Sequence, residues 1–319
     1  MQINKTYLYV GIGLLAAGGV TAALVLKAPK PGGGAATPAG DPEGFSKPRA
    51  IALMPSGNVI IADSKNNRLV IQKAEGSLVK RVGHMGTKDG DFREPCGVAV
   101  DRAGFIFVAD TFYTLDEKGG LPWGRVQKFS SEGKFMASWG KVSVAPNDLF
   151  GPRGIAVDSD GNVYLADTGN HRIVKYGDAG AFVAAWGKKG KAPLEFIEPF
   201  GLAFDKSDNL YVADRLNYRV QVLSKDGKFL RQFKVEGWEE GQINMEPYLA
   251  VDQKRELVYV SDPTKRKVHR YNLSGGAHKE ITAAAEAAFS LPTGLAVRES
   301  DGVVFVTDGN LARVLTIKP

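Results

Sequence analysis

Asp158, Asp160 and Asn162 stand at alternate positions in the segment DSDGN, a spacing that resembles the start of a calcium-binding loop. An EF-hand loop needs oxygen ligands at its first, third and fifth positions, a glycine at the sixth and a glutamate at the twelfth. Gly161 comes two places early in this register, and the twelfth position is Gly169. The segment therefore fails as a calcium loop, and we expect a tight turn whose amides bond to the aspartates.

Other residues that commonly carry chemistry are sparse in this chain. Cys96 is the one cysteine, which excludes an intrachain disulfide and any zinc site built from cysteines. The histidines fall at different positions relative to the sequence repeat described below, so symmetry does not bring them together, although a loop could unite one pair. They are His84, His171, His269 and His278.

The stretch around DSDGN is one of six similar segments, each of which begins at a proline. Each opening proline precedes a strand-ending aspartate by fifteen residues, or by sixteen in the last copy. The opening prolines are Pro48, Pro95, Pro152, Pro199, Pro247 and Pro292. The strand-ending aspartates are Asp63, Asp110, Asp167, Asp214, Asp262 and Asp308. A period of about 47 residues indicates a repeat architecture.

A basic residue follows the strand-ending aspartate by five positions in five of the copies. These residues are Arg68, Arg172, Arg219, Lys267 and Arg313. In the second copy Arg125 comes fifteen positions after the aspartate, so ten extra residues have entered. Because a catalytic residue is needed once and a structural one in every unit, we expect the aspartates to accept turn amides and the basic residues to pair with carboxylates.

Each copy divides into short strand-like runs, which in the third copy read GIAVD, NVYLAD, HRIVKY and AFVAAWG. Four strands separated by polar turns are the content of one propeller blade. The sequence therefore predicts an all-β, six-bladed propeller over residues 48–319. The chain ends after the third strand of the sixth copy, so we expect either a weakly closed ring or a three-stranded last blade.

The repeated pattern P-x-G-[IL]-A-V-D, followed by Y-[VL]-A-D-x-x-N-x-R, resembles the NHL repeat, and Thr168 to Arg172 match its consensus most closely. The resemblance covers about 85% of the chain, from Pro48 to Pro319. It implies an NHL-type propeller, a scaffold that hosts both binding modules and enzymes.

Six-bladed relatives suggest two enzyme templates, in which a metal lies at the central channel. One resembles the calcium-dependent lactonases and the other the amidating lyases, which bind zinc through histidines. The residue after each opening proline marks the expected channel mouth, and none is a carboxylate or a histidine. These residues are Arg49, Cys96, Arg153, Phe200, Tyr248 and Thr293. We therefore predict no catalytic residue, metal or cofactor there, with a lyase-type or lactonase-type propeller enzyme as the alternative.

The N-terminal residues differ in kind from the repeats. Residues 6–26 carry no charge, and as a helix they would extend roughly 32 Å, enough to cross a bilayer once. We expect a transmembrane anchor at 1–26, with a cleaved signal peptide as the alternative. Residues 27–47 are rich in Pro and Gly and are predicted to be a flexible linker. The short N-terminal flank favours a propeller on the extracytoplasmic, periplasmic side of a single-pass membrane protein.

The net charge of +6 is an excess of 41 basic over 35 acidic residues, which is too small to indicate a nucleic-acid partner. Basic residues nevertheless gather in the turns after the strand-ending aspartates, and the insertion in the second copy adds aromatic residues that no blade core requires. We expect this face to bind a partner through Phe112, Tyr113, Trp123, Arg215, Tyr218 and Arg266.

The sequence thus predicts a membrane-anchored protein-binding or scaffolding module, for example an accessory subunit of a membrane complex, with membrane-associated protein partners. RNA binding through the basic face is a second alternative, against which the anchor argues.

Overall fold

The computed structural model describes residues 43–112, 123–140, 148–239, 246–284 and 286–318. They belong to a compact unit that spans Thr37–Pro319. The predicted anchor (1–26) and the linker up to residue 42 lie outside the described residues. Within the described ranges, no helix combines the length and the apolar character that a membrane crossing requires.

The strands form six sheets, one for each sequence copy. Blade 1 contains β1 (Pro48–Leu53), β2 (Val59–Asp63), β3 (Arg68–Gln72) and β4 (Leu78–Val82). Blade 2 contains β5 (Pro95–Val100), β6 (Ile106–Phe112), β7 (Trp123–Phe129) and β8 (Phe135–Trp139). Blade 3 contains β9 (Pro152–Val157), β10 (Val163–Asp167), β11 (Arg172–Tyr176) and β12 (Phe182–Trp186).

The second half of the ring continues in the same order. Blade 4 contains β13 (Pro199–Phe204), β14 (Asn209–Asp214), β15 (Arg219–Ser224) and β16 (Phe229–Lys234). Blade 5 contains β17 (Leu249–Asp252), β18 (Leu257–Asp262), β19 (Lys267–Asn272) and β20 (Lys279–Ile281). Blade 6 contains β21 (Pro292–Arg298), β22 (Val303–Asp308) and β23 (Arg313–Ile317). The all-β, six-bladed propeller is confirmed.

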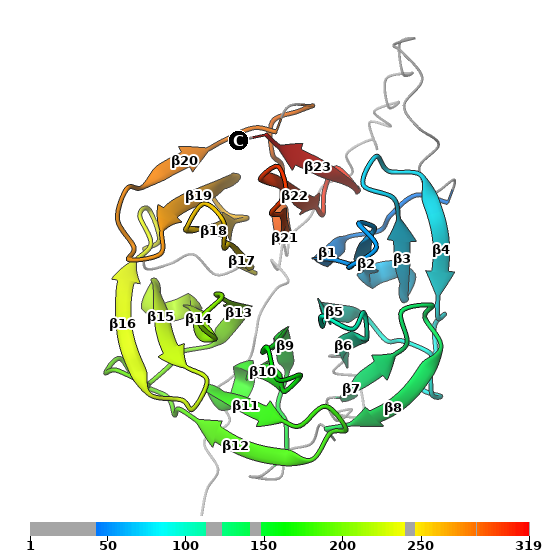
Figure 1. The fold of residues 1–319 in the computed structure, drawn as a ribbon, viewed down its shortest axis with the longest axis horizontal. Coiled ribbons are helices and arrows are strands. Elements are labelled where there is room, and N and C mark those ends of the chain that lie inside the picture. Colours follow the sequence, from blue (N-terminus) through cyan, green and yellow to red (C-terminus); the bar gives the residue numbers. More distant parts are fainter. Residues whose placement is uncertain (1–42, 113–122, 141–147, 240–245, 285, 319) are drawn as a thin grey trace, which may run out of the picture. The chain divides into compact units, whose positions relative to one another are not determined.

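Figure 1 shows the sheets arranged radially around one axis, with the first strand of each blade innermost. Successive strands pair antiparallel, so the two faces of the ring carry different loops. The turn face carries the turns after the strand-ending aspartates, which include the 3₁₀ turns η1 (Ser64–Asn66), η2 (Thr168–Asn170) and η3 (Arg215–Asn217), together with the connections between blades. The hairpin face carries the loops between the first and second strands, such as 158–162.

The core lies between neighbouring blades. One apolar cluster, for example, joins Ile60 and Leu69 of blade 1 to Val108 and Phe129 of blade 2. Because each inner sheet packs on a neighbour at both faces, β2 and β10 are buried at every residue. This double burial explains why the inner strands read as continuous apolar runs rather than as alternating ones.

The glycine of the P-x-G motif allows inner strands to approach closely. A Cβ atom at Gly154 would lie 2.0 Å from the carbonyl oxygen of Phe200 in the next blade. At Gly294, where the last blade meets the first, a Cβ would lie 2.2 Å from the carbonyl oxygen of Arg49. No side chain fits either gap, so the packing of inner strands around the axis requires glycine at these two positions.

The ring closes between blade 6 and blade 1. Blade 6 has three strands among the described residues, as one of the two sequence-based alternatives predicted. The hydroxyl of Thr293 donates to the carbonyl of Pro48 at 3.1 Å, and the hydroxyl of Thr307 donates to the carbonyl of Arg49. Ser64 and Thr168 make the corresponding bonds between earlier blades, so side-chain hydroxyl groups link the closing blades as they link the others.

The segment DSDGN is a turn, as predicted. The carboxylate of Asp158 accepts hydrogen bonds from the amides of Asp160 (3.0 Å) and Asn162 (2.8 Å) and from the hydroxyl of Tyr164 (3.0 Å). These donors occupy the oxygen atoms that a calcium ion would need.

Candidate partner-binding face

The strand-ending aspartates organise the turn face. Asp167 accepts hydrogen bonds from the amide of Phe150 (2.7 Å), the side-chain amide of Asn170 (2.8 Å) and Nε of Arg172 (2.7 Å). Asp63 and Asp214 accept the same three kinds of donor in blades 1 and 4. Each aspartate thus ties the turn to the connection from the previous blade and to the third strand.

Blade 2 departs from this pattern. Nε of Arg125 lies 4.0 Å from Oδ2 of Asp110, and the insertion has replaced the asparagine that bonds to the aspartate elsewhere. The amide of Arg93 still donates to Asp110 at 2.8 Å. Burial raises the pKa of Asp110 to about 7, because these remaining partners do not offset the loss of water.

The last two blades use the aspartate differently. Asp262 accepts the amide of Lys265 at 2.8 Å and contacts the ring of His269, whereas Lys267 pairs with Glu280 instead. Asp308 accepts the amide of Leu291 in the connection from blade 5 and that of Leu311 in its own turn, both at 3.0 Å. The side chain of Arg313 is exposed, so in blade 6 the aspartate is held by backbone groups rather than by an ion pair.

Charged side chains surround the mouth of the channel on the turn face. Nε of Arg49 lies 2.9 Å from Glu246, and Nη1 of Arg49 lies 3.7 Å from Glu94. Burial disfavours the charge on Glu246, but Arg49, together with Arg153 and Arg215, outweighs this burial and lowers the pKa of the carboxyl group. The side chain of Arg153 is half-buried at this mouth. The mouth therefore carries carboxylates that the positions after the opening prolines did not reveal.

Two of the mouth glutamates sit on a left-handed backbone. Glu94 has φ of 61° and Glu198 has φ of 56°, and Gly151 holds the equivalent position in blade 3 with φ of 62°. The amide of Glu94 donates to Oδ1 of Asn67, and the amide of Glu198 donates to Nδ1 of His171, both at 3.0 Å. Burial lowers the pKa of His171, which keeps Nδ1 able to accept this bond. A left-handed glutamate is uncommon, which makes these positions functional candidates.

Buried side chains fill the channel just inside this mouth. The hydroxyl of Tyr248 in blade 5 donates to the carbonyl of Cys96 in blade 2, on the opposite side of the ring. The ring of Phe200 packs edge-on against Tyr248 with centroids 5.5 Å apart. Tyr248, Phe200 and Cys96 are each less than a tenth exposed. The channel is therefore closed to a substrate at this level.

The predicted contact residues lie at different depths on the turn face. The guanidinium of Arg215 is buried and pairs with Glu198 at 2.7 Å, so it also stabilises the channel mouth. Tyr218 is half-buried and Arg266 is exposed. Phe112 and Trp123 pair in register at the ends of β6 and β7, so this hairpin extends two residue pairs beyond Asp110 and Arg125. Tyr113 lies outside the described residues.

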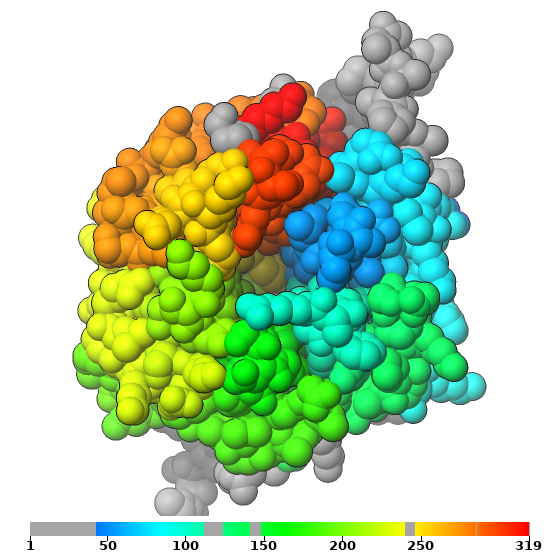
Figure 2. Space-filling view, viewed as in Figure 1, coloured from blue at the N-terminus to red at the C-terminus, as the bar shows by residue number. Residues whose placement is uncertain are grey.

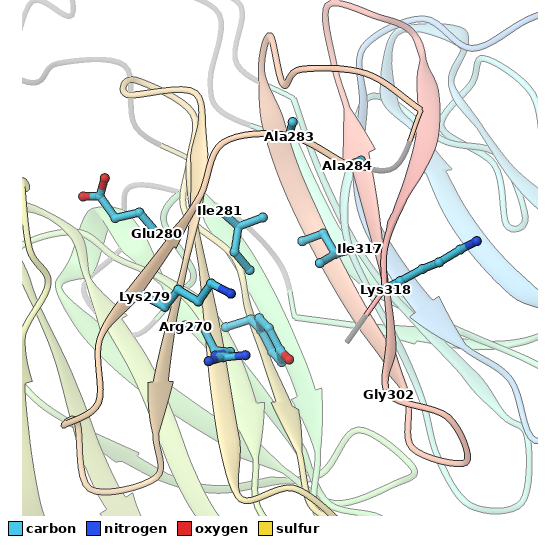
Figure 3. A pocket seen from close by; sticks show the side chains of 10 residues that line it. Arg270, Lys279, Glu280, Ile281, Ala283, Ala284, Gly302, Ile317 and Lys318 are labelled. Atoms are coloured by element: carbon cyan, nitrogen blue, oxygen red, sulfur yellow. The ribbon is translucent and has the colours of Figure 1, made fainter.

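Two hollows lie away from the turn face. Figure 2 shows the blades packed side by side around a hollowed centre. A basin of about 600 Å³ on the hairpin face is lined by Asp101, Asp158, Asp205 and Lys254, among others. A groove of about 350 Å³ lies between β20 and β23, where Ile281 and Ile317 project toward each other (Figure 3).

One group of possible metal ligands occurs in the described part of the chain, and it lies in blade 5. His269, His278 and Glu280 bring their ligand atoms within 4.8 Å of one another. Comparison of the histidines between blades missed this group, because the two histidines lie in the same blade. The useful signal was the cross-strand register of β19 and β20, which places His269 opposite Glu280.

Comparisons with known proteins agree with this fold. A family model described as the NHL repeat matches residues 45–71 and 151–176. Protein brain tumor of Drosophila melanogaster is 27% identical over 131 residues, which are 41% of this chain and 11% of that relative. The matched region thus spans about a tenth of the length of the curated relative.

Solved propellers superimpose over most of the chain. A gluconolactonase from Xanthomonas campestris gives a TM-score of 0.60 at 13% identity, covering 86% of this chain and 87% of that one. A virginiamycin B lyase from Staphylococcus aureus, solved with quinupristin, gives 0.58 at 15% identity, covering 87% and 82%. The PQQ-bound aldose sugar dehydrogenase of Streptomyces coelicolor gives 0.58 at 12% identity, covering 86% and 95%.

At these identities the solved structures share the fold, and the fold alone does not specify an activity. The chain carries NHL repeats and is built as a six-bladed β-propeller.

Proposed function

We propose that this propeller is a protein-binding module, held at a membrane by residues 6–26 with the propeller on the extracytoplasmic side. Its partner binds the turn face. The uncharged N-terminal run supports the anchor, because its length matches the hydrocarbon core of a bilayer. An NHL propeller can serve as a binding module, and the turn face has the features that recognition of a protein requires.

The channel mouth is the observation that carries the proposal. Tyr248 and Phe200 close the channel, yet the rim around them keeps Arg49, Arg153 and three glutamates on the turn face. The half-buried guanidinium of Arg153 acts on Glu246 through its charge, but no hydrogen bond or ion pair joins it to a residue that the structure describes. An arginine of this kind is well suited to a carboxylate of a partner, because its planar fork makes paired hydrogen bonds.

The strained backbone supports the same face. Glycine would adopt the left-handed conformation of Glu94 and Glu198 with less strain, as Gly151 does in blade 3. The two glutamates pair with Lys65 and Arg215, respectively, and so fix an alternating pattern of charge around the mouth. Alternating charge of this kind favours specificity and orientation in a protein interface.

The extended hairpin of blade 2 gives the face a protruding element. Pairs Thr111 with Gly124 and Phe112 with Trp123 continue the β6–β7 ladder past the point where other blades turn. The residues at the tip, 113–122, lie outside the described residues. Because Phe112 and Trp123 are directly paired, an Asn-Gly turn in place of 113–122 should close the hairpin without disturbing the blade.

The lyase or lactonase alternative has less support. Such an enzyme requires access to ligands or catalytic groups at the channel, and buried side chains fill the channel inside the turn-face mouth. The basin on the hairpin face is open, but in the described residues it holds no cluster of three metal-ligating side chains. We therefore place binding, rather than catalysis, at the turn face.

Partner recovery with matched variants tests this proposal. The full-length protein is purified from solubilised membranes in wild-type form and as Arg153→Ala, Lys254→Ala and the variant with Asn-Gly in place of 113–122. Lys254 is exposed on the hairpin face, so its loss is the control for a removed positive charge. We expect the partner to be retained by Lys254→Ala and reduced at least about tenfold by Arg153→Ala, which corresponds to about 1.4 kcal/mol.

Equal recovery by all variants, with unchanged melting temperatures, would contradict turn-face binding. The anchor has a separate test, which is N-terminal sequencing of the mature protein. A chain that starts at Ala23 would show that the apolar segment is a cleaved signal peptide.

A further inference from the structure

Blade 5 gathers three metal-ligating side chains on one face of the β19–β20 ribbon. His269 lies directly opposite Glu280, and His278 precedes Glu280 by two residues, so all three share a face. Their ligand atoms lie within 4.8 Å of one another. We propose that His269, His278 and Glu280 bind a divalent transition-metal ion, for which Zn²⁺ is the best match. Two imidazoles and a carboxylate suit zinc, and a fourth position would remain open to water.

His269 is oriented as a ligand should be. Its side chain is fully buried, and its Nε2 lies 3.2 Å from Oδ2 of Asp262. With the Nε2 proton donated to this carboxylate, Nδ1 keeps its lone pair and faces His278. Histidines that bind metals commonly donate their other ring N–H to a carboxylate, which fixes the tautomer and the ring.

The second histidine lies at a compatible distance. Nε2 of His278 is 3.0 Å from Nδ1 of His269. Two ligands of a tetrahedral zinc ion with bonds of about 2.0–2.1 Å are about 3.3 Å apart, so a small movement of the rings admits the ion. The ring of Tyr271 stacks on His278 with centroids 4.8 Å apart and limits its rotation.

The third ligand is shared with a competing cation. Nζ of Lys267 lies 2.6 Å from Oε1 of Glu280; the side chain of Glu280 is exposed, whereas that of Lys267 is largely buried. In blades 1, 3 and 4 the residue at the position of Lys267 is an arginine that binds the strand-ending aspartate. A metal ion would have to displace this ammonium group from Glu280, so removal of Lys267 should strengthen metal binding.

Blade 4 supplies the matched control. There Gln221 occupies the position of His269 and donates to Asp214 at 3.0 Å, and it lies opposite Gln232. Leu230 precedes Gln232 by two residues and is exposed. The triple variant His269→Gln, His278→Leu, Glu280→Gln therefore gives blade 5 the side chains that blade 4 already accommodates.

Zinc titration of the full-length, detergent-solubilised protein tests the site. After dialysis against EDTA, Zn²⁺ is added in competition with a chromophoric chelator. We expect one ion per chain in wild type and in His84→Ala, which removes an exposed histidine outside the cluster. The triple variant should bind none at this site and should melt at the same temperature as metal-free wild type.

Single variants test each ligand. We expect Glu280→Gln to weaken zinc binding by more than the 10- to 100-fold that loss of an outer partner costs. Lys267→Gln should tighten it. An absence of stoichiometric zinc in wild type would overturn the proposal, as would unchanged affinity in the triple variant. Unchanged affinity in Glu280→Gln alone would refute the three-ligand site.

Discussion

Blades 4 and 5 build different polar clusters around the same strand-ending aspartate. Asp214 of blade 4 accepts hydrogen bonds from Asn217, Arg219 and Gln221, so side chains of its own blade surround it. Asp262 of blade 5 keeps one backbone amide and the ring of His269, which in turn faces His278 at the surface. The repeat thus preserves the aspartate but not its partners. In blade 4 the partners form a closed network, whereas in blade 5 they lead through His269 to His278 at the surface.

This difference shows which positions of the repeat can change while the turn and the interblade connection are kept. The aspartate fixes the turn and the interblade connection, so the scaffold needs it in each blade. The residues five and seven positions later need only satisfy the aspartate. In blade 4 they do so completely, with Arg219 also donating to carbonyl groups of the connection from blade 3. In blade 5, Lys267 pairs with Glu280 instead of the aspartate, and Nδ1 of His269 faces His278.

The largest change in the free energy of unfolding is expected when the network around Asp214 of blade 4 is broken. Asp214→Asn should lower the free energy of unfolding by about 3–5 kcal/mol, because Arg219 loses its buried carboxylate. Asp262→Asn should cost less, about 1–3 kcal/mol, since the amide oxygen of asparagine can still accept a hydrogen bond from the ring of His269. Urea unfolding of both variants measures the difference. Equal losses would show that the two clusters are energetically alike.

The second-largest expected effect is the stabilisation of the protein by Zn²⁺ bound at blade 5. If blade 5 holds the ion, zinc at 100 times its dissociation constant should stabilise wild type by about 2.7 kcal/mol. The triple variant that carries the side chains of blade 4 should show no such gain. Thermal melts with and without Zn²⁺ measure this effect, and a similar gain in the triple variant would place the ion elsewhere.

In blade 2, no described side chain donates a hydrogen bond to Asp110, and Nε of Arg125 lies 4.0 Å from its carboxylate. Because the pKa of Asp110 is raised to about 7 in the fold, its contribution to stability is present at low pH and is lost as pH rises through 7. Relative to that of Asp110→Asn, the free energy of unfolding of wild type should fall by up to about 1.4 kcal/mol per pH unit between pH 5 and 7. Unfolding of both proteins across this range checks the slope, and parallel profiles would contradict it.

The smallest expected effect concerns His171 of blade 3. The structure lowers its pKa, so its contribution to stability is present above about pH 6.5 and is lost as pH falls below that value. His171→Asn copies Asn67 of blade 1, which accepts the corresponding glutamate amide. We expect a change within about 0.5 kcal/mol at pH 7.5 and a variant that is less sensitive to acid. If the free energy of unfolding of wild type and of the variant fell equally with decreasing pH, the stabilising role of neutral His171 would be contradicted.

Most of the fold could be predicted from the sequence, because the repeat is strong and local. The spacing from Pro152 to Asp167 marks two inner strands, and its recurrence defines the blades. A three-stranded last blade was one of the two alternatives that the sixth copy left open. What the pattern did not specify was how the ring closes, since the bonds of Thr293 and Thr307 to blade 1 join residues about 250 positions apart.

The candidate sites were harder to predict, because they combine residues from different phases of the repeat. Inspection of the position after each opening proline found Arg49 and Arg153 but missed Glu94 and Glu246, which precede a proline. The burial of Arg215 also depends on its pairing with Glu198. Such cross-blade contacts follow from the radial arrangement of the strands, which periodicity alone does not specify.

The most direct test of turn-face binding is site-specific photo-crosslinking in native membranes. A photoreactive residue is introduced at Arg266, which is exposed on the turn face, and, in a separate protein, at Lys254 on the hairpin face. We expect a discrete protein adduct from position 266 that is lost when 113–122 is replaced by Asn-Gly, and no adduct from position 254. An adduct from position 254 alone, or from neither position, would contradict partner binding at the turn face.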